Sequence, residues 1–278
     1  MGAPMARHLA GAAHEVTVWN RTTAKAEAWV GAHGGRAAAS PRDAAEGADA
    51  VFTCVGNDDD VRAVVLGEHG ALAGMRPGAV LVDHTTASAA LAHGLETAAG
   101  AVGVRFVDAP VSGGQAGAEN GTLSVMCGGT ADAFAAAEPL VAAYARACRL
   151  LGPAGSGQLT KMVNQICIAG IVQGLAEGVA FAQRAGLDVD AVVETISKGA
   201  AQSWQMENRA RTMARGEFEF GFAVEWMRKD LGICLDEAAR NGARLPITAL
   251  VDQFYAHVVA RGGRRWDTSS LIHLLAND

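Results

Sequence analysis

The stretch Gly155-Ser-Gly-Gln-Leu-Thr-Lys-Met-Val-Asn-Gln165 joins a glycine-punctuated turn to the longest apolar run of the sequence. Residues 158–184 contain no proline, and most of their side chains are apolar, which predicts a long helix that is buried on several sides. Lys161 is the only lysine in this run, and Asn164 and Gln165 follow three and four residues later. At that spacing the three polar side chains share one face of the predicted helix.

Lys161 has two interpretations. A lysine in an apolar wall is suited to proton transfer near neutral pH, because burial disfavours the ammonium form, and Asn164 one turn away is placed to orient it. The alternative is a lysine that extends from a helix end to water, which is the commoner role of a single lysine. The rest of the chain decides between the two.

Composition excludes several classes of function. The chain has 278 residues, half of them hydrophobic, and a formal net charge of −6, so it is long enough for two modest domains and lacks a basic surface for nucleic acid or an anionic membrane. No signal peptide is recognised, and the polar side chains in the apolar run argue against a membrane span.

The cysteines and histidines indicate neither disulfides nor a metal site. The cysteines have no paired spacing and apolar neighbours, so we expect core thiols of a reducing compartment and a cytoplasmic protein. The eight histidines lie apart, and no metal ligand set is expected. The five cysteines are Cys54, Cys127, Cys148, Cys167 and Cys234. The acidic triplet Asp58-Asp-Asp60 fits a helix N-terminus better than a metal site.

Residues 1–153 alternate helical patterns with short β-branched runs, which predicts a doubly wound, parallel, Rossmann-type α/β domain. Strands are expected at residues 15–20, 50–54, 79–83, 104–108, 123–127 and near 149. Helices are expected at residues 1–13, 23–32 and 41–47 and from residues 58, 88 and 131. Ligands bind beyond the carboxyl ends of the strands in such a sheet. The segments found there are Asn20-Arg21-Thr22, Val55-Gly56-Asn57, His84-Thr85-Thr86 and residues 108–114.

The beginning of the chain looks like the end of a dinucleotide-binding fingerprint. In Met1-Gly2-Ala-Pro4-Met5-Ala, Gly2 corresponds to the third glycine of Gly-x-Gly-x-x-Gly, and the first strand and first two glycines are missing. Our hypothesis is that the natural chain begins upstream. Its test is an in-frame apolar strand with Gly-x-Gly in the genomic DNA before Met1.

Residues 154–278 show no strand pattern and predict an all-helical domain for substrate binding and dimerisation. Helices are expected at residues 158–184, 190–197, 204–214, 223–241, 247–261 and 269–275. The first of these is too apolar for the surface of a monomer, so we expect it to pack against a second subunit in a homodimer or homotetramer.

Together these motifs resemble the β-hydroxyacid dehydrogenase family, over essentially the whole chain. The family includes 3-hydroxyisobutyrate dehydrogenases, glyoxylate/succinic semialdehyde reductases and, more distantly, 6-phosphogluconate dehydrogenase. The segments that carry the resemblance are Met1-Gly-Ala-Pro-Met-Ala, Val18-Trp-Asn-Arg21, Asp83-His-Thr-Thr86, Asp108 to Ala118 with Gly121-Thr-Leu, Gly155-Ser-Gly with Lys161 and Asn164, and Lys229-Asp230-Leu231.

The resemblance implies roles for individual residues. Lys161 matches the catalytic lysine, and Asn164 matches the residue that positions the lysine and the substrate. Ser112, with the backbone N–H groups of Gly113 and Gly114, matches the loop that holds the substrate carboxylate. A hydroxyl group beside glycine amides makes a good anion site on physical grounds as well.

Other residues follow from the same resemblance. Lys229 and Asp230 match a pair near the nicotinamide. Trp204 falls where several such dehydrogenases have a pocket tryptophan, although plain helix packing explains it equally well. Gln165 stands where relatives have a second asparagine, and it is expected at the substrate pocket.

The segment Asn20-Arg21-Thr22 bears on the choice of cofactor. An acidic residue there would bind the ribose 2′-hydroxyl of NAD, whereas Arg21 can pair with the 2′-phosphate of NADP. We therefore expect NADP in preference to NAD. The expected cofactor contacts also include Gly2, Pro4, Met5, Val55, Gly56, Asn57 and Thr86.

The predicted function is hydride transfer between NAD(P) and a small β-hydroxy acid or its semialdehyde, with Lys161 as general acid and base. One alternative is an imine reductase-like enzyme, but by resemblance such enzymes usually replace the lysine. Another is a non-catalytic nucleotide-binding or scaffold relative, which the truncated fingerprint favours and Lys161, Ser112 and Asn164 disfavour. The chain lacks the basic residues that a sugar-phosphate substrate needs.

Overall fold

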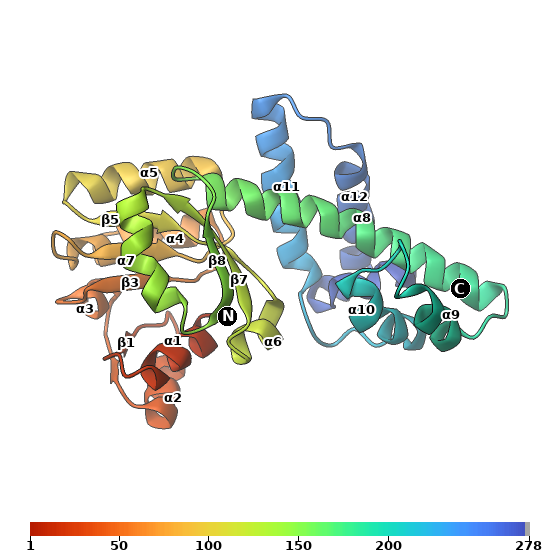
Figure 1. The fold of residues 1–278 in the computed structure, drawn as a ribbon, viewed down its shortest axis with the longest axis horizontal. Coiled ribbons are helices and arrows are strands. Elements are labelled where there is room, and N and C mark those ends of the chain that lie inside the picture. Colours follow the sequence, from red (N-terminus) through yellow and green to blue (C-terminus); the bar gives the residue numbers. More distant parts are fainter. Residues whose placement is uncertain (276–278) are drawn as a thin grey trace. The chain divides into compact units, whose positions relative to one another are not determined.

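The computed structural model describes residues 1–275 and contains two compact units, residues 1–161 and residues 162 onward (Figure 1). The division falls inside α8 (Ser156–Arg184), a continuous helix that begins in the first unit and runs into the second. Each unit has a hydrophobic core of its own.

The first unit alternates strands and helices, as the sequence predicts. Its strands are β1 (Thr17–Val18), β2 (Arg36–Ala37), β3 (Ala50–Thr53), β4 (Val80–Asp83), β5 (Arg105–Asp108), β6 (Val111–Ser112), β7 (Leu123–Gly129) and β8 (Ala145–Leu150). Its helices are α1 (Gly2–Gly11), α2 (Thr23–His33), α3 (Pro41–Ala45), α4 (Asp58–Leu66), α5 (Ala89–Ala101), α6 (Gly114–Glu119) and α7 (Ala131–Val141), with a 3₁₀ turn η1 (Ala71–Ala73).

The strands form two sheets. β1 pairs in parallel with β2 alone, and a six-stranded sheet has the order β3-β4-β5-β7-β6, with β8 paired to β7. β3, β4 and β5 are parallel and in register, which aligns Thr53 with Asp83 and Asp83 with Asp108 at their carboxyl ends. The prediction of a uniformly parallel sheet is wrong at β7 and β8, because β7 runs antiparallel to both β5 and β6 and β8 runs parallel to β7. Residues 113–122 join β6 to β7, and that segment is too short for a parallel crossover.

Both faces of the large sheet are covered. Leu81 of β4 packs in one cluster with residues of α3, α4 and α5, whereas Val80 and Val82 pack in a second cluster with residues of α1 and α7. Successive side chains of a strand point to opposite faces, so a strand covered on both sides reads as a continuous apolar run. This arrangement leaves the carboxyl ends of β3, β4 and β5 as the edge where polar side chains gather.

Several helices begin where the sequence indicates. Ser40 accepts a hydrogen bond from the backbone N–H of Asp43 and begins α3, and Asn57 accepts one from the N–H of Asp60 and begins α4. The acidic triplet of residues 58–60 therefore occupies the first turn of a helix, where negative charge is stabilising. The short elements β2, β6 and α6 were not predicted, because two-residue strands and six-residue helices have too little periodicity to recognise.

The second unit is helical, as predicted. After α8 come α9 (Val189–Ile196), α10 (Trp204–Arg215), α11 (Val224–Asn241), α12 (Pro246–Ala260) and the 3₁₀ segments η2 (Gly263–Arg265) and η3 (Thr268–Leu274). One core cluster contains side chains of all five α-helices and of η3. Asp188 caps α9 by accepting from two backbone N–H groups, and Gly242 ends α11 in the left-handed conformation.

One face of α8 is exposed in the single chain. Every third or fourth residue along it is solvent-exposed and apolar or small: Leu159, Val163, Cys167, Ile171, Gly174, Gly178 and Phe181. Because Cys167 belongs to this face, the prediction of a buried thiol is wrong for it. By length and composition, α8 is also the one helix among residues 1–275 that could cross a membrane, a criterion that core helices of soluble proteins meet as well.

Candidate functional site

Lys161 lies in the second turn of α8, and its side chain is only 8% exposed. The first turn of this helix is bound by a carboxylate from β5: Asp108 Oδ1 accepts from the N–H of Gly155 at 2.7 Å, and Oδ2 accepts from the N–H of Gln158 at 2.8 Å. Burial raises the pKa of Asp108 to about 6, and the two backbone hydrogen bonds oppose that shift. The sequence-predicted base thus stands one turn beyond a helix end that is fixed to the sheet.

Gln158 connects the same turn to the segment that follows β4. Its side-chain nitrogen donates to the carbonyl oxygen of Thr85 at 2.7 Å, and its side-chain oxygen accepts from the N–H of Ala87 at 2.9 Å. Thr86, a predicted cofactor contact, lies between these two residues. The side chain of Gln158 therefore joins the predicted cofactor segment to the start of the lysine-bearing helix.

A second buried carboxylate, that of Asp83, binds the segment that follows β4. Asp83 Oδ1 accepts from the hydroxyl of Thr53 at 2.8 Å and from the N–H of Thr85 at 3.0 Å. Burial raises the pKa of Asp83 to about 6, against these hydrogen bonds. Thr85 also accepts from the N–H of Val55, which links the ends of β3 and β4.

His84 follows Asp83 in the chain and is buried. Its Nδ1 lies 2.6 Å from the carbonyl oxygen of Ala109, which can only accept, so Nδ1 carries the proton and Nε2 accepts from the hydroxyl of Tyr144 at 2.7 Å. The ring stacks on Phe52. Burial lowers the pKa of His84 from 6.5 to about 4, and burial also raises the pKa of the Tyr144 phenol.

The predicted carboxylate-binding loop lies between the short strand β6 and α6. Ser112 ends β6 and is half-buried, and Gly113 and Gly114 are exposed at the start of α6. Both glycines have positive φ, 129° and 62°, which L side chains rarely adopt, and a Cβ at Gly113 would lie 3.1 Å from Leu123. No side chain caps α6, so the loop offers a hydroxyl and backbone amides to an anion.

The predicted cofactor residues occupy the amino terminus of α1 and the loops after β1 and β3. α1 begins at Gly2 without a side-chain cap. Asn20 accepts from the N–H of Thr22 at 2.9 Å and so shapes its own loop, whereas Arg21 is 85% exposed and lies 3.4 Å from Asp60. A helix terminus with uncapped amides and an extended guanidinium suit a pyrophosphate and an adenosine ribose or its 2′-phosphate. The residues present therefore fit a nicotinamide dinucleotide.

Four other predicted cofactor residues have structural roles in the first unit. Met5, a residue of α1, is buried in the hydrophobic core, and Asn57 caps α4. Pro4 lies in the first turn of α1, where a proline costs no hydrogen bond. Gly56 is part of the turn between β3 and α4.

In the second unit, four predicted residues are linked by two hydrogen bonds and one ion pair. Asn164 donates to the side-chain oxygen of Gln165 at 2.7 Å, Gln165 donates to Asp230 Oδ2 at 2.7 Å, and Lys229 Nζ lies 2.8 Å from Asp230 Oδ1. Gln165 and Asp230 are each 2% exposed. These contacts join α8 to α11, and they order Asn164 one turn after Lys161.

Trp204 lies at the start of α10 and is 56% exposed. The Arg209 guanidinium is 4.8 Å from its ring centroid and 5.0 Å from that of Phe220, and it pairs with buried Asp267 at 3.0 Å. The indole therefore forms an exposed aromatic surface with Phe220, held by a buried ion pair, and it is not packed in the helical core.

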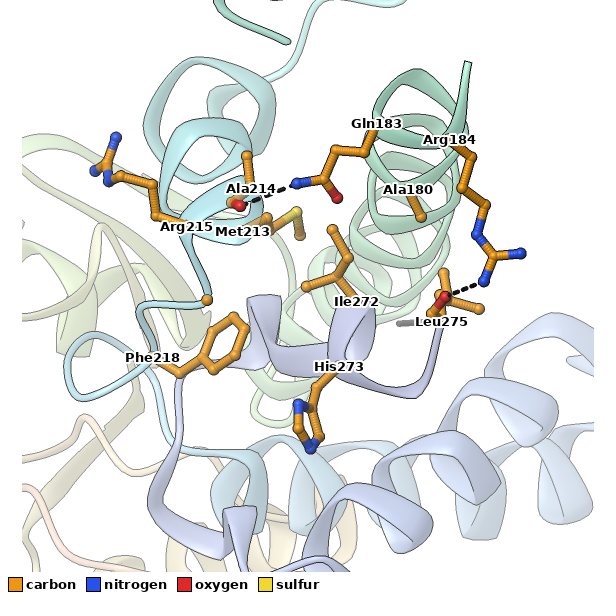
Figure 2. A pocket seen from close by; sticks show the side chains of 11 residues that line it. Ala180, Gln183, Arg184, Met213, Ala214, Arg215, Phe218, Ile272, His273 and Leu275 are labelled. Carbon is orange, nitrogen blue, oxygen red and sulfur yellow. Dashed lines mark hydrogen bonds between the residues drawn. The ribbon is translucent and has the colours of Figure 1, made fainter. Parts of the chain in front are cut away.

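A separate cavity of about 420 Å³ lies within the helical unit (Figure 2). Gln183 donates to the carbonyl oxygen of Ala214 at its wall, and Arg184 donates to that of Leu275. The other lining residues are Ala180, Met213, Arg215, Gly216, Phe218, Ile272 and His273. None of the predicted site residues lines it. Within residues 1–275, no group of three His, Cys, Asp or Glu side chains is placed to hold a metal ion.

Sequence reasoning missed the part played by Asp108 and Gln158. Both lie within quoted motifs, Asp108 as the last residue of a predicted strand and Gln158 in the first turn of the lysine helix. The sequence did offer one signal: each of these polar residues stands at the end of an apolar element, Asp108 at the end of a strand and Gln158 at the start of a helix. Their pairing spans 50 residues, and a single sequence does not reveal such a contact.

Comparisons with known proteins agree with this geometry. Residues 1–152 match the family described as the NAD binding domain of 6-phosphogluconate dehydrogenase. Residues 155–275 match the family described as NAD-binding of NADP-dependent 3-hydroxyisobutyrate dehydrogenase.

Individual relatives cover nearly the whole chain. An uncharacterized oxidoreductase of Shewanella frigidimarina is 64% identical, covering 98% of this chain and 94% of the relative. A probable 3-hydroxyisobutyrate dehydrogenase-like mitochondrial protein of Arabidopsis thaliana is 42% identical, covering 98% and 81%. The solved structure of Mycobacterium tuberculosis 3-hydroxyisobutyrate dehydrogenase with L-serine has a TM-score of 0.89 and 30% identity, covering 100% and 96%.

Proposed function

Because the chain belongs to the β-hydroxyacid dehydrogenase family, we propose that it oxidises a small β-hydroxy acid to its semialdehyde, or reduces the semialdehyde, with Lys161 as general acid and base. The chain is an NAD(P)-dependent oxidoreductase acting on CH–OH groups. The observation that carries the proposal for Lys161 is its burial on a helix turn whose start is bound to Asp108.

In the proposed reaction a nicotinamide held at the cofactor contacts named below would supply the hydride donor or acceptor. The chain itself binds, orients and moves a proton. Lys161 Nζ takes the proton of the substrate hydroxyl during oxidation and returns it to the carbonyl oxygen during reduction. Ser112 and the amides of Gly113 and Gly114 hold the substrate carboxylate, which fixes the reacting carbon, and orientation of this kind contributes about 7–11 kcal/mol.

The hydrogen-bonded chain of the helical unit supports the role of Asn164. Gln165 and Asp230 hold its carboxamide, so that Asn164 is ordered before a substrate arrives. The exposed indole of Trp204 supplies an apolar surface for the substrate side chain.

We propose NADP as the preferred cofactor. The support is Arg21, an exposed guanidinium after β1 where an NAD-specific enzyme would present a carboxylate. The α1 amino terminus from Gly2, the turns at residues 55–57, Thr86 and the Lys229–Asp230 pair are the remaining proposed contacts.

We also propose that the protein works in the cytoplasm as a homodimer or homotetramer and binds neither nucleic acid nor membrane. The apolar exposed face of α8 supports the assembly, because single-chain exposure of Val163 at 60% and Phe181 at 71% is costly in water. The net charge of −6 supports the absence of a polyanionic partner.

A substrate panel tests the function. Small β-hydroxy acids, among them 3-hydroxyisobutyrate, serine and 3-hydroxypropionate, are assayed with NAD and NADP, and semialdehydes and glyoxylate with the reduced cofactors. We expect cofactor-dependent turnover of at least one β-hydroxy acid and a higher kcat/KM with NADP. Cofactor binding without turnover of any member would favour the non-catalytic alternative, and turnover of imines alone would favour the imine reductase alternative.

A further inference from the structure

One buried carboxylate fixes the start of α8 to the sheet. Both oxygens of Asp108 are used, by the N–H groups of Gly155 and Gln158, and the side chain is completely buried. The first amides of a helix have no partner within the helix and carry partial positive charge. A charged acceptor that binds two of them therefore holds the helix end more firmly than a neutral cap would.

The backbone around Asp108 is so closely packed that two glycines beside its carboxylate have no space for a Cβ atom. A Cβ on Gly157 would stand 2.8 Å from Asp108 Oδ2 and would collide with the carbonyl oxygen of Met126. A Cβ on Gly128 would stand 2.5 Å from Asp108 Oδ1. Carbon atoms do not approach neighbours so closely in folded proteins. The turn is thus packed closely against β5 and β7.

Gln158 extends this junction to a third segment. It is 1% exposed, and both ends of its carboxamide are bonded, to the carbonyl oxygen of Thr85 and the N–H of Ala87. Both of these bonds are to backbone atoms of the segment. It therefore fixes the path of the backbone on both sides of Thr86.

We propose that Asp108 and Gln158 are positioning residues that set where the Lys161 amine stands relative to the Ser112 loop and Thr86. Ser112 lies four residues after Asp108 on the chain that leaves β5, and Lys161 lies three residues after Gln158 in the next turn of α8. One junction thus fixes the three elements that carry the proton-transfer, carboxylate and cofactor groups. This inference rests on the proposed function.

Asp108→Asn tests the junction with little change in volume. An amide has one acceptor oxygen, and its NH₂ group would face an N–H donor, so one of the two bonds to α8 is lost. We expect kcat to fall by about 10- to 100-fold, as misplacement of a reacting group by about 1 Å does. The dissociation constant of NADP(H) is expected to stay within about threefold of the wild-type value, and the pH profile of kcat to shift.

Thr130→Ala is the matched control. Thr130 caps α7 by accepting from the N–H of Ala133 at 3.1 Å, in the same unit, and α7 carries no site residue. The control loses a helix cap as well, so it reports the effect of destabilisation alone, and its kcat should stay within about twofold of wild type. A folded Asp108→Asn variant with unchanged kcat and pH profile would overturn the proposal.

A readout that needs no turnover separates this inference from the proposed function. The chain has four lysines, Lys25, Lys161, Lys198 and Lys229, so protein labelled with [ε-¹³C]lysine gives four NMR signals. Lys161→Arg assigns the Lys161 signal. We expect Asp108→Asn to move that signal and to leave those of Lys25 and Lys198 in place, and an unmoved Lys161 signal would overturn the proposal.

Gln158→Met keeps the question decidable if Asp108→Asn does not fold. It is similar in length and removes both bonds to the segment around Thr86, so we expect it to weaken NADP(H) binding at least threefold and to move the Lys161 signal. If a folded Gln158→Met variant binds NADP(H) as the wild type does and its Lys161 signal does not move, the inference is contradicted. If the wild-type protein turns over no hydroxy acid, the proposed function fails, and the Lys161 signal still decides whether the junction positions the amine.

Discussion

Gln165 donates a 2.7 Å hydrogen bond to the carboxylate of Asp230, and that carboxylate also pairs with Lys229 at 2.8 Å. Gln165 stands where the family resemblance leads us to expect asparagine, and its longer side chain makes this buried contact between α8 and α11. The departure from the pattern therefore has a structural consequence in this chain: Gln165 connects Asn164 to a buried ion pair.

Replacement of Asp230 tests this connection. Asp230→Ala removes the shared partner of Gln165 and Lys229, and breaking a buried pair in this way costs about 3–5 kcal/mol of unfolding free energy. The measurement is equilibrium urea unfolding. Arg211→Ala, which breaks an exposed pair with Asp190, is the control and should cost no more than about 1 kcal/mol. Equal losses in the two variants would show that Asp230 contributes no more than a surface pair.

His84 makes stability depend on pH. Its pKa is lowered from 6.5 to about 4 in the folded chain, so between these values the unfolded chain binds a proton that the folded chain does not. The contribution of this group is therefore complete above pH 6.5 and is lost as pH falls toward 4. His84→Gln removes that dependence.

The comparison of wild type with His84→Gln at two pH values isolates the contribution of His84 protonation to the free energy of unfolding. Between about pH 7 and pH 5 the wild type should lose about 2 kcal/mol more unfolding free energy than the variant. The raised pKa values of Asp83 and Asp108 act in the opposite direction in both proteins and cancel in the difference. An equal loss in the two proteins would show that His84 is not held neutral.

Arg21 is predicted to select NADP. Arg21→Ala should lower kcat/KM for NADP by about 10-fold or more, since a charge-assisted bond to the 2′-phosphate is worth about 1.5–3 kcal/mol. The value for NAD should stay within about twofold. Arg62→Ala, which removes an arginine that pairs with Asp58 and Asp59 in the first turn of α4, is the control. A parallel decrease for both cofactors would remove the selective role of Arg21.

The exposed face of α8 is predicted to pair with a second subunit. Ile171→Arg and Phe181→Glu place charges on that face and should shift the protein to monomer in sedimentation velocity. Leu187→Glu changes a residue that is 51% exposed beyond the end of α8 and should leave the assembly intact. If the wild-type chain is a monomer at micromolar concentration, the proposed dimer is wrong.

The fold and the residue types of the site could be predicted from the sequence, because both depend on local patterns. β4 begins with the apolar run Val80 to Val82, and the lysine helix is uninterrupted from Ser156 to Arg184. Contacts between distant segments could not be predicted. The antiparallel course of β7 and the junction of Asp108 with Gln158 depend on pairings across the sheet, which no local period encodes.

The exposure of particular residues also escaped prediction. Cys167 has apolar neighbours in sequence, yet it lies on the outer face of α8 because helical geometry places it beside Val163 and Ile171. Trp204 was open to two interpretations, and its exposure in the chain together with its contact to Arg209 distinguishes it from a core residue.

The most direct test of the account is turnover by Lys161→Ala beside cofactor titration of the same protein. We predict that kcat for the best hydroxy acid of the panel falls by about 10²- to 10⁴-fold, the contribution of a general acid or base, while the dissociation constant of NADP(H) stays within about threefold of wild type. Lys198→Ala, at an exposed lysine of the helical unit, should leave both values unchanged. A Lys161→Ala protein that retains most of the wild-type kcat would contradict the assignment of Lys161 as the proton-transferring group.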